Sequence, residues 1–316
     1  MIAGAAAMAA TAAFIAVKTR RSEPARGRFV TVQGVNLHYI EAGKGPPVVI
    51  LHGNGSMIAE MAASGLVDAL AEQHRVLVFD RPGYGHSSRP RSTIWTPERQ
   101  AELFLAAFEE LGLEEPLVVA HSWATLVALA AAIQKPSALR GIVLMSGYYF
   151  PTARLDALML AVPAIPLLGD IIRHTISPLL GRLAWRRLVG RMFAPRRITA
   201  RFEREFSKWM ALRPSQIRAS AAEAGMMVPA AAALRGRYGD ISIPVAIIAG
   251  AEDRLVDTSN QSERLAAEMP HATLRIVPGL GHMMHHFAAP EIAAIVDGMD
   301  PGTRQPTRRL RTAGRA

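Results

Sequence analysis

The chain contains 316 residues, 50% of them hydrophobic, and it carries a formal net charge of +10 and no cysteine. This length and composition allow a large buried core, so the fold does not require disulfides or a structural metal. The lack of cysteine excludes thiolate catalysis and a disulfide scaffold. We therefore expect one large domain with an insertion.

The positive charge is unevenly distributed along the chain. Residues 18–28 and residues 300–316 each carry a net charge of +4, and residues 151–240 carry 15 basic and six acidic side chains. The rest of the chain is therefore acidic. No nucleic-acid-binding motif accompanies these charges, so we expect no nucleic-acid partner. Binding of the basic central segment to anionic lipid remains an alternative role.

The first 17 residues are uncharged and contain nine alanines, and Lys18, Arg20 and Arg21 follow them. Seventeen apolar residues are at the short limit for a membrane-spanning helix, and basic residues after the run do not fit a secretory signal peptide. Two alternatives remain, a membrane anchor and an Ala-rich extension. If the segment spans a membrane, the positive-inside rule predicts that the body lies on the cytoplasmic side.

Short apolar runs alternate with longer helical patterns through the body of the chain. Nearly unbroken Val, Ile and Leu runs are typical of parallel strands that are covered on both faces. The pattern predicts an α/β fold with a mostly parallel central sheet and helices on both faces. The predicted strands are Asn36–Tyr39, Pro47–Leu51, Arg75–Phe79, Pro116–Ala120, Gly141–Met145, Pro244–Ile248 and Thr273–Val277.

One helix between these strands has a clear beginning. Thr96 is a suitable N-cap, Pro97 suits the first helical position, and apolar residues recur at helical spacing as far as Leu111. We expect a helix from Pro97 to the end of this pattern.

The alternation of strands and helices fails between about residues 148 and 240. This segment has helical patterns interrupted by prolines, and it lies between two predicted strands of the sheet. We expect it to form a helical cap over the carboxyl edge, where ligands bind in open α/β sheets. The predicted organisation is an N-terminal segment 1–28, a core of 29–147 and 241–299, a cap of 148–240 and a disordered basic tail of 300–316.

Ser122 is the candidate nucleophile. The predicted strand Pro116–Ala120 leads through His121 to Ser122, and an Ala/Leu helical pattern begins at Trp123. A serine at such a corner presents its hydroxyl to a histidine and to helix N-terminal amides.

His282 is the candidate general base, because it directly follows the predicted strand Thr273–Val277 and its Gly-rich loop. His285 and His286 are alternatives, but helical spacing would carry them away from Ser122. Serine catalysis needs a base within hydrogen-bonding distance of the nucleophile.

Asp253 is the candidate acid that would orient this base. It follows the predicted strand Pro244–Ile248, and Glu252 and Asp257 are its competitors. The chain order of serine, acid and histidine, each after a core strand, favours the three acting together.

Two backbone N–H groups are predicted to bind an oxyanion. The N–H of Trp123 lies at the start of the helix that follows Ser122. The segment 52–56 (HGNGS) ends another strand, and its small residues allow close approach of the backbone to a ligand, so Asn54 supplies the second N–H. A tight glycine turn without an oxyanion role is the alternative for this segment.

Met and aromatic residues near the cap are candidate substrate contacts. Flexible thioethers suit a hydrophobic acyl group, although residues of these types also fill ordinary cores. The candidates are Tyr148, Tyr149, Met159, Trp209 and Met226.

These motifs resemble the α/β-hydrolase superfamily, in particular its cap-bearing serine hydrolases. The resemblance covers roughly residues 28–298. It implies the roles of nucleophile, acid and base for Ser122, Asp253 and His282, and oxyanion N–H groups for Asn54 and Trp123. The motifs that carry it are 52–55 (HGNG), 80–87 (DRPGYGHS), 121–123 (HSW), Gly250 with Asp253, and Gly281 with His282.

The resemblance also narrows the expected chemistry. Members that open epoxides or displace halide use an aspartate where this chain has Ser122. Hydrolysis of an ester, thioester, amide or carbon–carbon bond remains, as does cofactor-free perhydrolysis. Among these we expect hydrolysis of an ester-type bond in a hydrophobic small molecule, with no cofactor or metal. The chain departs from the family's Gly-x-Ser-x-Gly pattern at Ala120 and Ala124. This departure leaves a catalytically silent ligand-binding relative as an alternative.

Overall fold

The computed structural model describes residues 23–153 and 159–299. The apolar segment 1–17 and the basic tail 300–316, for which an anchor and disorder were predicted, lie outside the described residues. Within the described part of the chain, no helix combines the length and the hydrophobicity that crossing a membrane requires.

An eight-stranded sheet forms the centre of the molecule, with strand order β1-β2-β4-β3-β5-β6-β7-β8. The strands from β4 to β8 in this order pair in parallel, whereas β2 is antiparallel to both β1 and β4. The mostly parallel sheet predicted from the sequence is confirmed. The strands are β1 Arg28–Val32, β2 Val35–Ala42, β3 Pro47–Leu51, β4 Arg75–Phe79, β5 Leu117–His121, β6 Gly141–Met145, β7 Val245–Gly250 and β8 Thr273–Val277.

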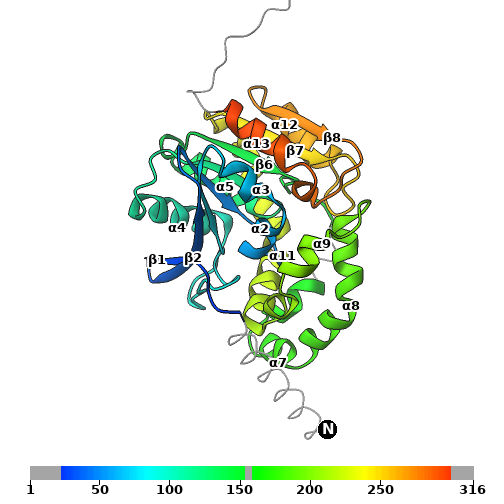
Figure 1. Cartoon of the computed structure of the whole chain (residues 1–316). Helices are drawn as coiled ribbons and strands as arrows, with labels where there is room; N and C mark the ends of the chain where they lie inside the picture. Colours follow the sequence, from blue (N-terminus) through cyan, green and yellow to red (C-terminus); the bar gives the residue numbers. More distant parts are fainter. Residues whose placement is uncertain (1–22, 154–158, 300–316) are drawn as a thin grey trace, which may run out of the picture.

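Helices cover both faces of this sheet, as Figure 1 shows. Alternate residues of the strands point to opposite faces, so Val49 and Leu51 of β3 belong to one hydrophobic core and Val48 and Ile50 to the other. Both faces are therefore buried. The helices are α2 Ile58–Ala63, α3 Leu66–Leu70 and α13 Ala289–Gly298 on one face, and α4 Pro97–Glu110, α5 Ala124–Gln134 and α12 Arg264–Glu268 on the other.

Helix α4 begins where its sequence predicts. The Thr96 side chain accepts a hydrogen bond from the Arg99 N–H at 3.2 Å, and Pro97 occupies the first helical position. Its buried residues recur on one face, and they include Leu103, Phe104 and Phe108.

The segment expected to form a cap is helical wherever it is described. Between β6 and β7, the described residues contain five complete α-helices, a short helical segment at 159–161 and two 3₁₀ turns, and no strand. In Figure 1 these helices form a layer beside the sheet, with α8 at its outer side. They are η2 Val162–Ala164, α7 Leu168–His174, α8 Ile176–Phe193, α9 Ala200–Glu205, α10 Lys208–Ala211, α11 Pro214–Leu234 and η3 Arg235–Asp240.

Candidate active site

Ser122 occupies a sharp corner between β5 and α5. Its φ of 53° lies in the left-handed region, which is uncommon for a residue with a side chain. The Ser122 N–H donates to the Met145 carbonyl at 2.8 Å, which holds this backbone conformation in place. The space opposite this corner is tight, because a Cβ added to Gly53 would lie 3.0 Å from both the Ser122 Cβ and the His121 Nδ1.

The His282 ring lies between Ser122 and Asp253. Its Nε2 is 2.9 Å from the Ser122 Oγ, and its Nδ1 is 2.7 Å from the Asp253 Oδ2. The other Asp253 oxygen accepts the N–H groups of Leu255 and Val256 at 2.8 and 3.0 Å. With the Nδ1 proton donated to Asp253, Nε2 is free to accept the hydroxyl proton of Ser122, which is the arrangement that activates a serine.

The competing acids and bases lie elsewhere. Glu252 is exposed, and Asp257 accepts the Asn260 N–H at 2.7 Å, where it caps the start of a helical segment. His285 and His286 both point to the Glu60 carboxylate, with Nε2–Oε1 distances of 2.6 and 2.7 Å. His282 is therefore the histidine beside Ser122.

The buried Glu60 anchors the turn that carries His282. The Glu60 carboxylate also accepts a hydrogen bond from the Ser56 hydroxyl at 2.8 Å. Burial raises the pKa of Glu60, but the charge of His285 and the hydrogen bonds from His285 and His286 outweigh burial and hold that pKa well below its usual range. Since these histidines lie three and four residues after His282, Glu60 holds the turn from which the His282 ring projects.

Glu60, His285 and His286 are also close enough together to be considered as metal ligands. A metal-bound histidine normally donates its second ring N–H to an acceptor. Within the described residues, the Nδ1 atoms of His285 and His286 are buried and have no partner. These Nδ1 atoms fit imidazoles that donate through Nε2 to the carboxylate, and they do not fit a metal site.

Hydrogen bonds to the Gly53 carbonyl fix the orientation of the peptide group that joins Gly53 to Asn54. The Gly53 carbonyl accepts hydrogen bonds from the Arg81 Nη2 at 3.0 Å and from the His52 Nδ1 at 2.8 Å. In a planar trans peptide the N–H points away from the carbonyl. Arg81 and His52 therefore set the direction of the Asn54 N–H.

Helix α11 holds the side chains of both predicted oxyanion residues. The Asn54 Nδ2 donates to the Ser220 carbonyl at 3.1 Å, and the Ser220 hydroxyl donates to the Asn54 Oδ1 at 2.6 Å. The Trp123 Nε1 donates to the Glu223 carbonyl at 3.2 Å. The cap segment thus contacts the site directly through α11.

A fully buried ion pair connects the same helix to the core. The Arg81 guanidinium binds the Glu223 carboxylate at 2.6 and 2.9 Å, and the Tyr84 hydroxyl donates to Glu223 at 2.6 Å. Burial raises the pKa of Glu223, but the charge and hydrogen bonds of Arg81 lower it further than burial raises it. Sequence reasoning assigned the segment 80–87 only a structural turn, and it missed Glu223, whose one signal is its position as a lone acid in an Ala-rich helical pattern.

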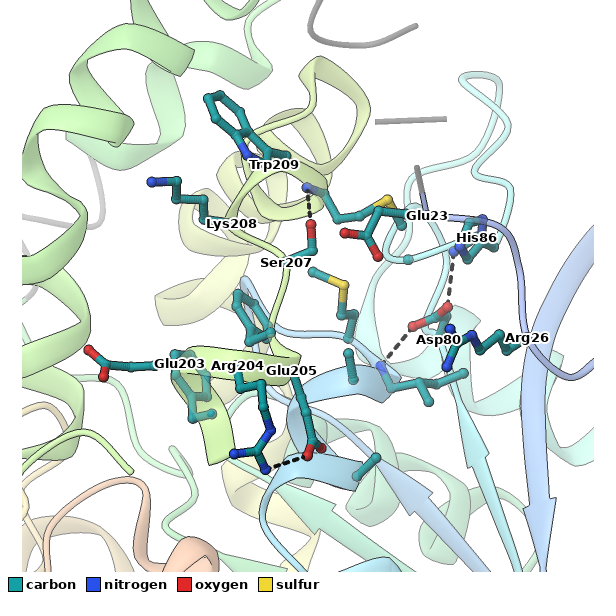
Figure 2. Close-up of a pocket in the computed structure, with 18 of the residues that line it drawn as sticks. Glu23, Arg26, Asp80, His86, Glu203, Arg204, Glu205, Ser207, Lys208 and Trp209 are labelled. Carbon is teal, nitrogen blue, oxygen red and sulfur yellow. Dashed lines mark hydrogen bonds and ion pairs between the residues drawn. The ribbon is translucent and has the colours of Figure 1, made fainter. Parts of the chain in front are cut away.

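A cavity of about 880 Å³ lies between the cap and the core, and Figure 2 shows its lining. Its walls come from residues 23–26, from α2 and from helices α8 to α10, and they include Trp209. Ser122 and His282 do not line this cavity.

The remaining candidate substrate contacts lie in different surroundings. Tyr148 and Tyr149 are packed in the hydrophobic core beside α5, and Met226 is half-buried on α11. Met159 is 78% exposed, so its side chain points largely to solvent, and its role as a substrate contact stays a prediction.

Comparison with known proteins identifies the family. A profile of the alpha/beta hydrolase fold family matches residues 46–289. Haloalkane dehalogenase 2 of Mycobacterium tuberculosis H37Rv is 24% identical over 287 residues, covering 86% of this chain and 94% of the relative. A 2-hydroxymuconate semialdehyde hydrolase of Pseudomonas sp. CF600 is 31% identical over 141 residues, covering 43% of this chain and 50% of the relative.

Solved structures agree with this fold. An enol-lactonase from Burkholderia xenovorans LB400 superimposes with a TM-score of 0.67 at 21% identity, covering 86% of this chain and 99% of that one. An epoxide hydrolase from Vigna radiata gives a TM-score of 0.68 at 19% identity, covering 86% and 96%. The profile match and the eight-stranded sheet together show that the chain belongs to the alpha/beta hydrolase fold family.

Proposed function

We propose that this chain is a serine hydrolase that cleaves an ester-type bond of a hydrophobic small molecule through an acyl-enzyme on Ser122. The observation that carries the proposal is the hydrogen-bonded chain from Ser122 through His282 to Asp253, with distances of 2.9 and 2.7 Å. Nucleophile, base and orienting acid are thereby in contact before any substrate is bound.

In the proposed reaction, the Ser122 Oγ attacks the carbonyl carbon while the His282 Nε2 takes the hydroxyl proton. The N–H groups of Asn54 and Trp123 donate to the oxyanion that forms. His282 then gives its proton to the departing alcohol, and the acyl group remains on Ser122. A water molecule, deprotonated by His282, releases the acid and restores the serine.

The identity of the nucleophile distinguishes the proposed reaction from the displacement of halide. Haloalkane dehalogenase 2 aligns over most of the chain, but displacement of halide in this superfamily uses an aspartate at the position of Ser122. Acyl transfer to a serine hydroxyl is the chemistry that the residues of this chain support.

A hydrophobic acyl group is proposed because α11, the helix that contacts Asn54 and Trp123, carries the half-buried Met226 and Met227. Flexible thioethers of this kind suit a hydrophobic acyl group. With p-nitrophenyl acetate, hexanoate and laurate, we expect the hexanoate or the laurate to have the highest kcat/KM. The highest kcat/KM for acetate would contradict this substrate class without affecting the role of Ser122.

A fluorophosphonate probe tests the catalytic proposal. The purified full chain should be labelled, and both labelling and ester hydrolysis should be lost in Ser122→Ala. Ser259→Ala is a suitable control, because Ser259 is an exposed serine that interacts with Glu263. Absence of labelling, or labelling that survives Ser122→Ala, would overturn the proposal, and tight ligand binding without turnover would instead support the silent relative.

A further inference from the structure

Large apolar side chains are concentrated on the outer side of the cap. Of the fifteen large hydrophobic residues that are exposed in the described parts of the chain, eleven lie between residues 159 and 188. We call this surface of η2, α7 and α8 the cap outer face. Monomeric soluble proteins seldom expose so many neighbouring apolar side chains without a function for them.

The pattern is clearest on α8. Ile176, Leu179, Leu180 and Leu183 are 44 to 76% exposed, and their spacing places them on one face of the helix. Val189 and Phe193, on another face of α8, are buried against the core side. Helix α8 is therefore apolar on two faces, and packing within the described chain accounts for only one of them.

The charges around this face are almost all positive. Residues 159–198 contain seven arginines and one aspartate. The aspartate, Asp170, is already paired with Arg91 and Arg173. Among the arginines of α8, Arg187 and Arg191 are exposed and lie at helical spacing beside Leu180 and Leu183, whereas Arg182 packs over the Trp209 ring and Arg186 lines the cavity. Arginine stems lie along apolar surfaces while their guanidinium groups bind phosphate, a combination that suits an anionic lipid surface.

The chain that precedes the described core reaches the same helices. Residues 23–26 line the cavity together with residues of α8, α9 and α10, and Figure 2 shows Glu23 and Arg26 on the core side of this cavity. The first 17 residues are uncharged and apolar, and four basic residues lie between Lys18 and Arg26. The chain thus enters the described structure at Glu23, beside the helices that carry the cap outer face on their other side.

We propose that the cap outer face binds the surface of an anionic lipid bilayer. The exposed leucines enter the boundary between headgroups and acyl chains, and the arginines contact the lipid phosphates. The contact is interfacial and does not require any helix to span the bilayer. It is independent of catalysis at Ser122.

Co-sedimentation of the full chain with vesicles tests this proposal. We expect binding to vesicles of phosphatidylglycerol and phosphatidylcholine, several-fold weaker binding to phosphatidylcholine alone, and weaker binding at high salt. The double substitution Leu179→Gln and Leu183→Gln should lower the partition coefficient by about tenfold or more, since it removes apolar area without adding charge.

The matched control is Ile94→Gln. Ile94 is 77% exposed and Leu183 is 76% exposed, but Ile94 lies outside the cap. This control should bind vesicles like the unsubstituted chain, and circular dichroism should show the same thermal unfolding for all three proteins.

Two outcomes would overturn the proposal. Equal vesicle binding by the double variant and the control would assign membrane binding to another part of the chain. An unsubstituted chain that does not bind vesicles but forms a dimer, dissociated by the double variant in light scattering, would assign the cap outer face to contact between copies.

Discussion

Asp253 is held more rigidly than an exposed loop carboxylate, because two backbone N–H groups bind one oxygen and His282 binds the other. Asp253→Asn keeps the shape but favours the wrong tautomer of His282. We expect kcat for p-nitrophenyl hexanoate to fall roughly a thousand- to ten-thousand-fold, with a small change in KM. Asp257→Asn, which affects a helix cap instead, should retain nearly full activity, and a similar loss in both variants would contradict the role of Asp253.

Glu60 gives a second prediction at the scale of single residues. In Glu60→Gln the negative charge is lost, so the hydrogen bonds from His285 and His286 to Oε1 are no longer charge-assisted, and the amide nitrogen that replaces Oε2 cannot accept from the Ser56 hydroxyl. We expect the free energy of unfolding, measured with urea at pH 7, to fall by about 2 to 3 kcal/mol.

The control for Glu60 is Glu291→Gln, which removes a partly exposed pairing with Arg275. Surface pairs of this kind contribute little, so its free energy of unfolding should change by less than about 1 kcal/mol. An equal decrease in the free energy of unfolding of the two variants would contradict the prediction that the buried Glu60 pairing contributes more to stability than a surface pairing.

At the scale of elements, α11 connects the cap to the predicted oxyanion groups. Glu223→Gln removes the charge that orients Arg81, and Arg81 in turn fixes the Gly53 carbonyl. We expect kcat to fall about 10- to 100-fold with little change in KM, because the oxyanion interaction is made mainly in the transition state.

Arg81→Lys should not restore this function, because a single ammonium cannot replace a guanidinium that binds the carboxylate and two backbone carbonyls together. Glu102→Gln is the control, since Glu102 pairs with Arg99 on the surface of α4. A change in KM alone, or equal effects of Glu223→Gln and Glu102→Gln, would contradict the positioning role of α11.

The elements show how much of this protein is predictable from its sequence. The seven predicted strands are confirmed as β2 to β8, because continuous Val, Ile and Leu runs match strands that are buried on both faces. The edge strand β1 was missed, since its residues Arg28, Phe29 and Thr31 are exposed and its alternation spans only five positions.

Only some residues of the candidate site could be predicted from the sequence. Ser122, Asp253 and His282 follow β5, β7 and β8, and sequence order alone predicted that they would lie at one edge of the sheet. The pairing of Arg81 with Glu223 spans 142 positions and depends on how α11 crosses the core. No local pattern carries that information, so these positioning residues emerge only from the fold.

For the whole molecule, buried neutral histidines predict how stability depends on pH. The His52 Nδ1–H donates to the Gly53 carbonyl, and its Nε2 accepts the Arg81 N–H at 3.0 Å. Protonation of Nε2 would therefore break the hydrogen bond from Arg81. Burial, assisted by the charge of Arg81, lowers the pKa of His52 to about 4. Burial also lowers the pKa of His121 well below its usual range.

The sign of the effect follows from proton binding. Between pH 6.5 and 4 the unfolded chain takes up a proton at His52 and the folded chain does not, so the free energy of unfolding falls as the pH falls. The contribution of His52 amounts to about 3 kcal/mol across this range. Urea unfolding at pH 7, 6 and 5 should show the decline, and His52→Gln should make it less steep. An unchanged pH dependence in His52→Gln would contradict the assignment.

The contacts of α11 limit how this protein can change its substrate range. Helices α7 to α10 make no described hydrogen bond to Asn54 or Trp123, so the predicted oxyanion groups constrain their sequences less than that of α11. Helix α11 is more constrained, because its residues Ser220 and Glu223 hold the side chains of Asn54 and Trp123, the two predicted oxyanion residues. A chimera that imports a foreign cap should therefore end its graft before Pro214 and keep the native α11, because replacing α11 as well would remove the hydrogen bonds that hold Asn54 and Trp123.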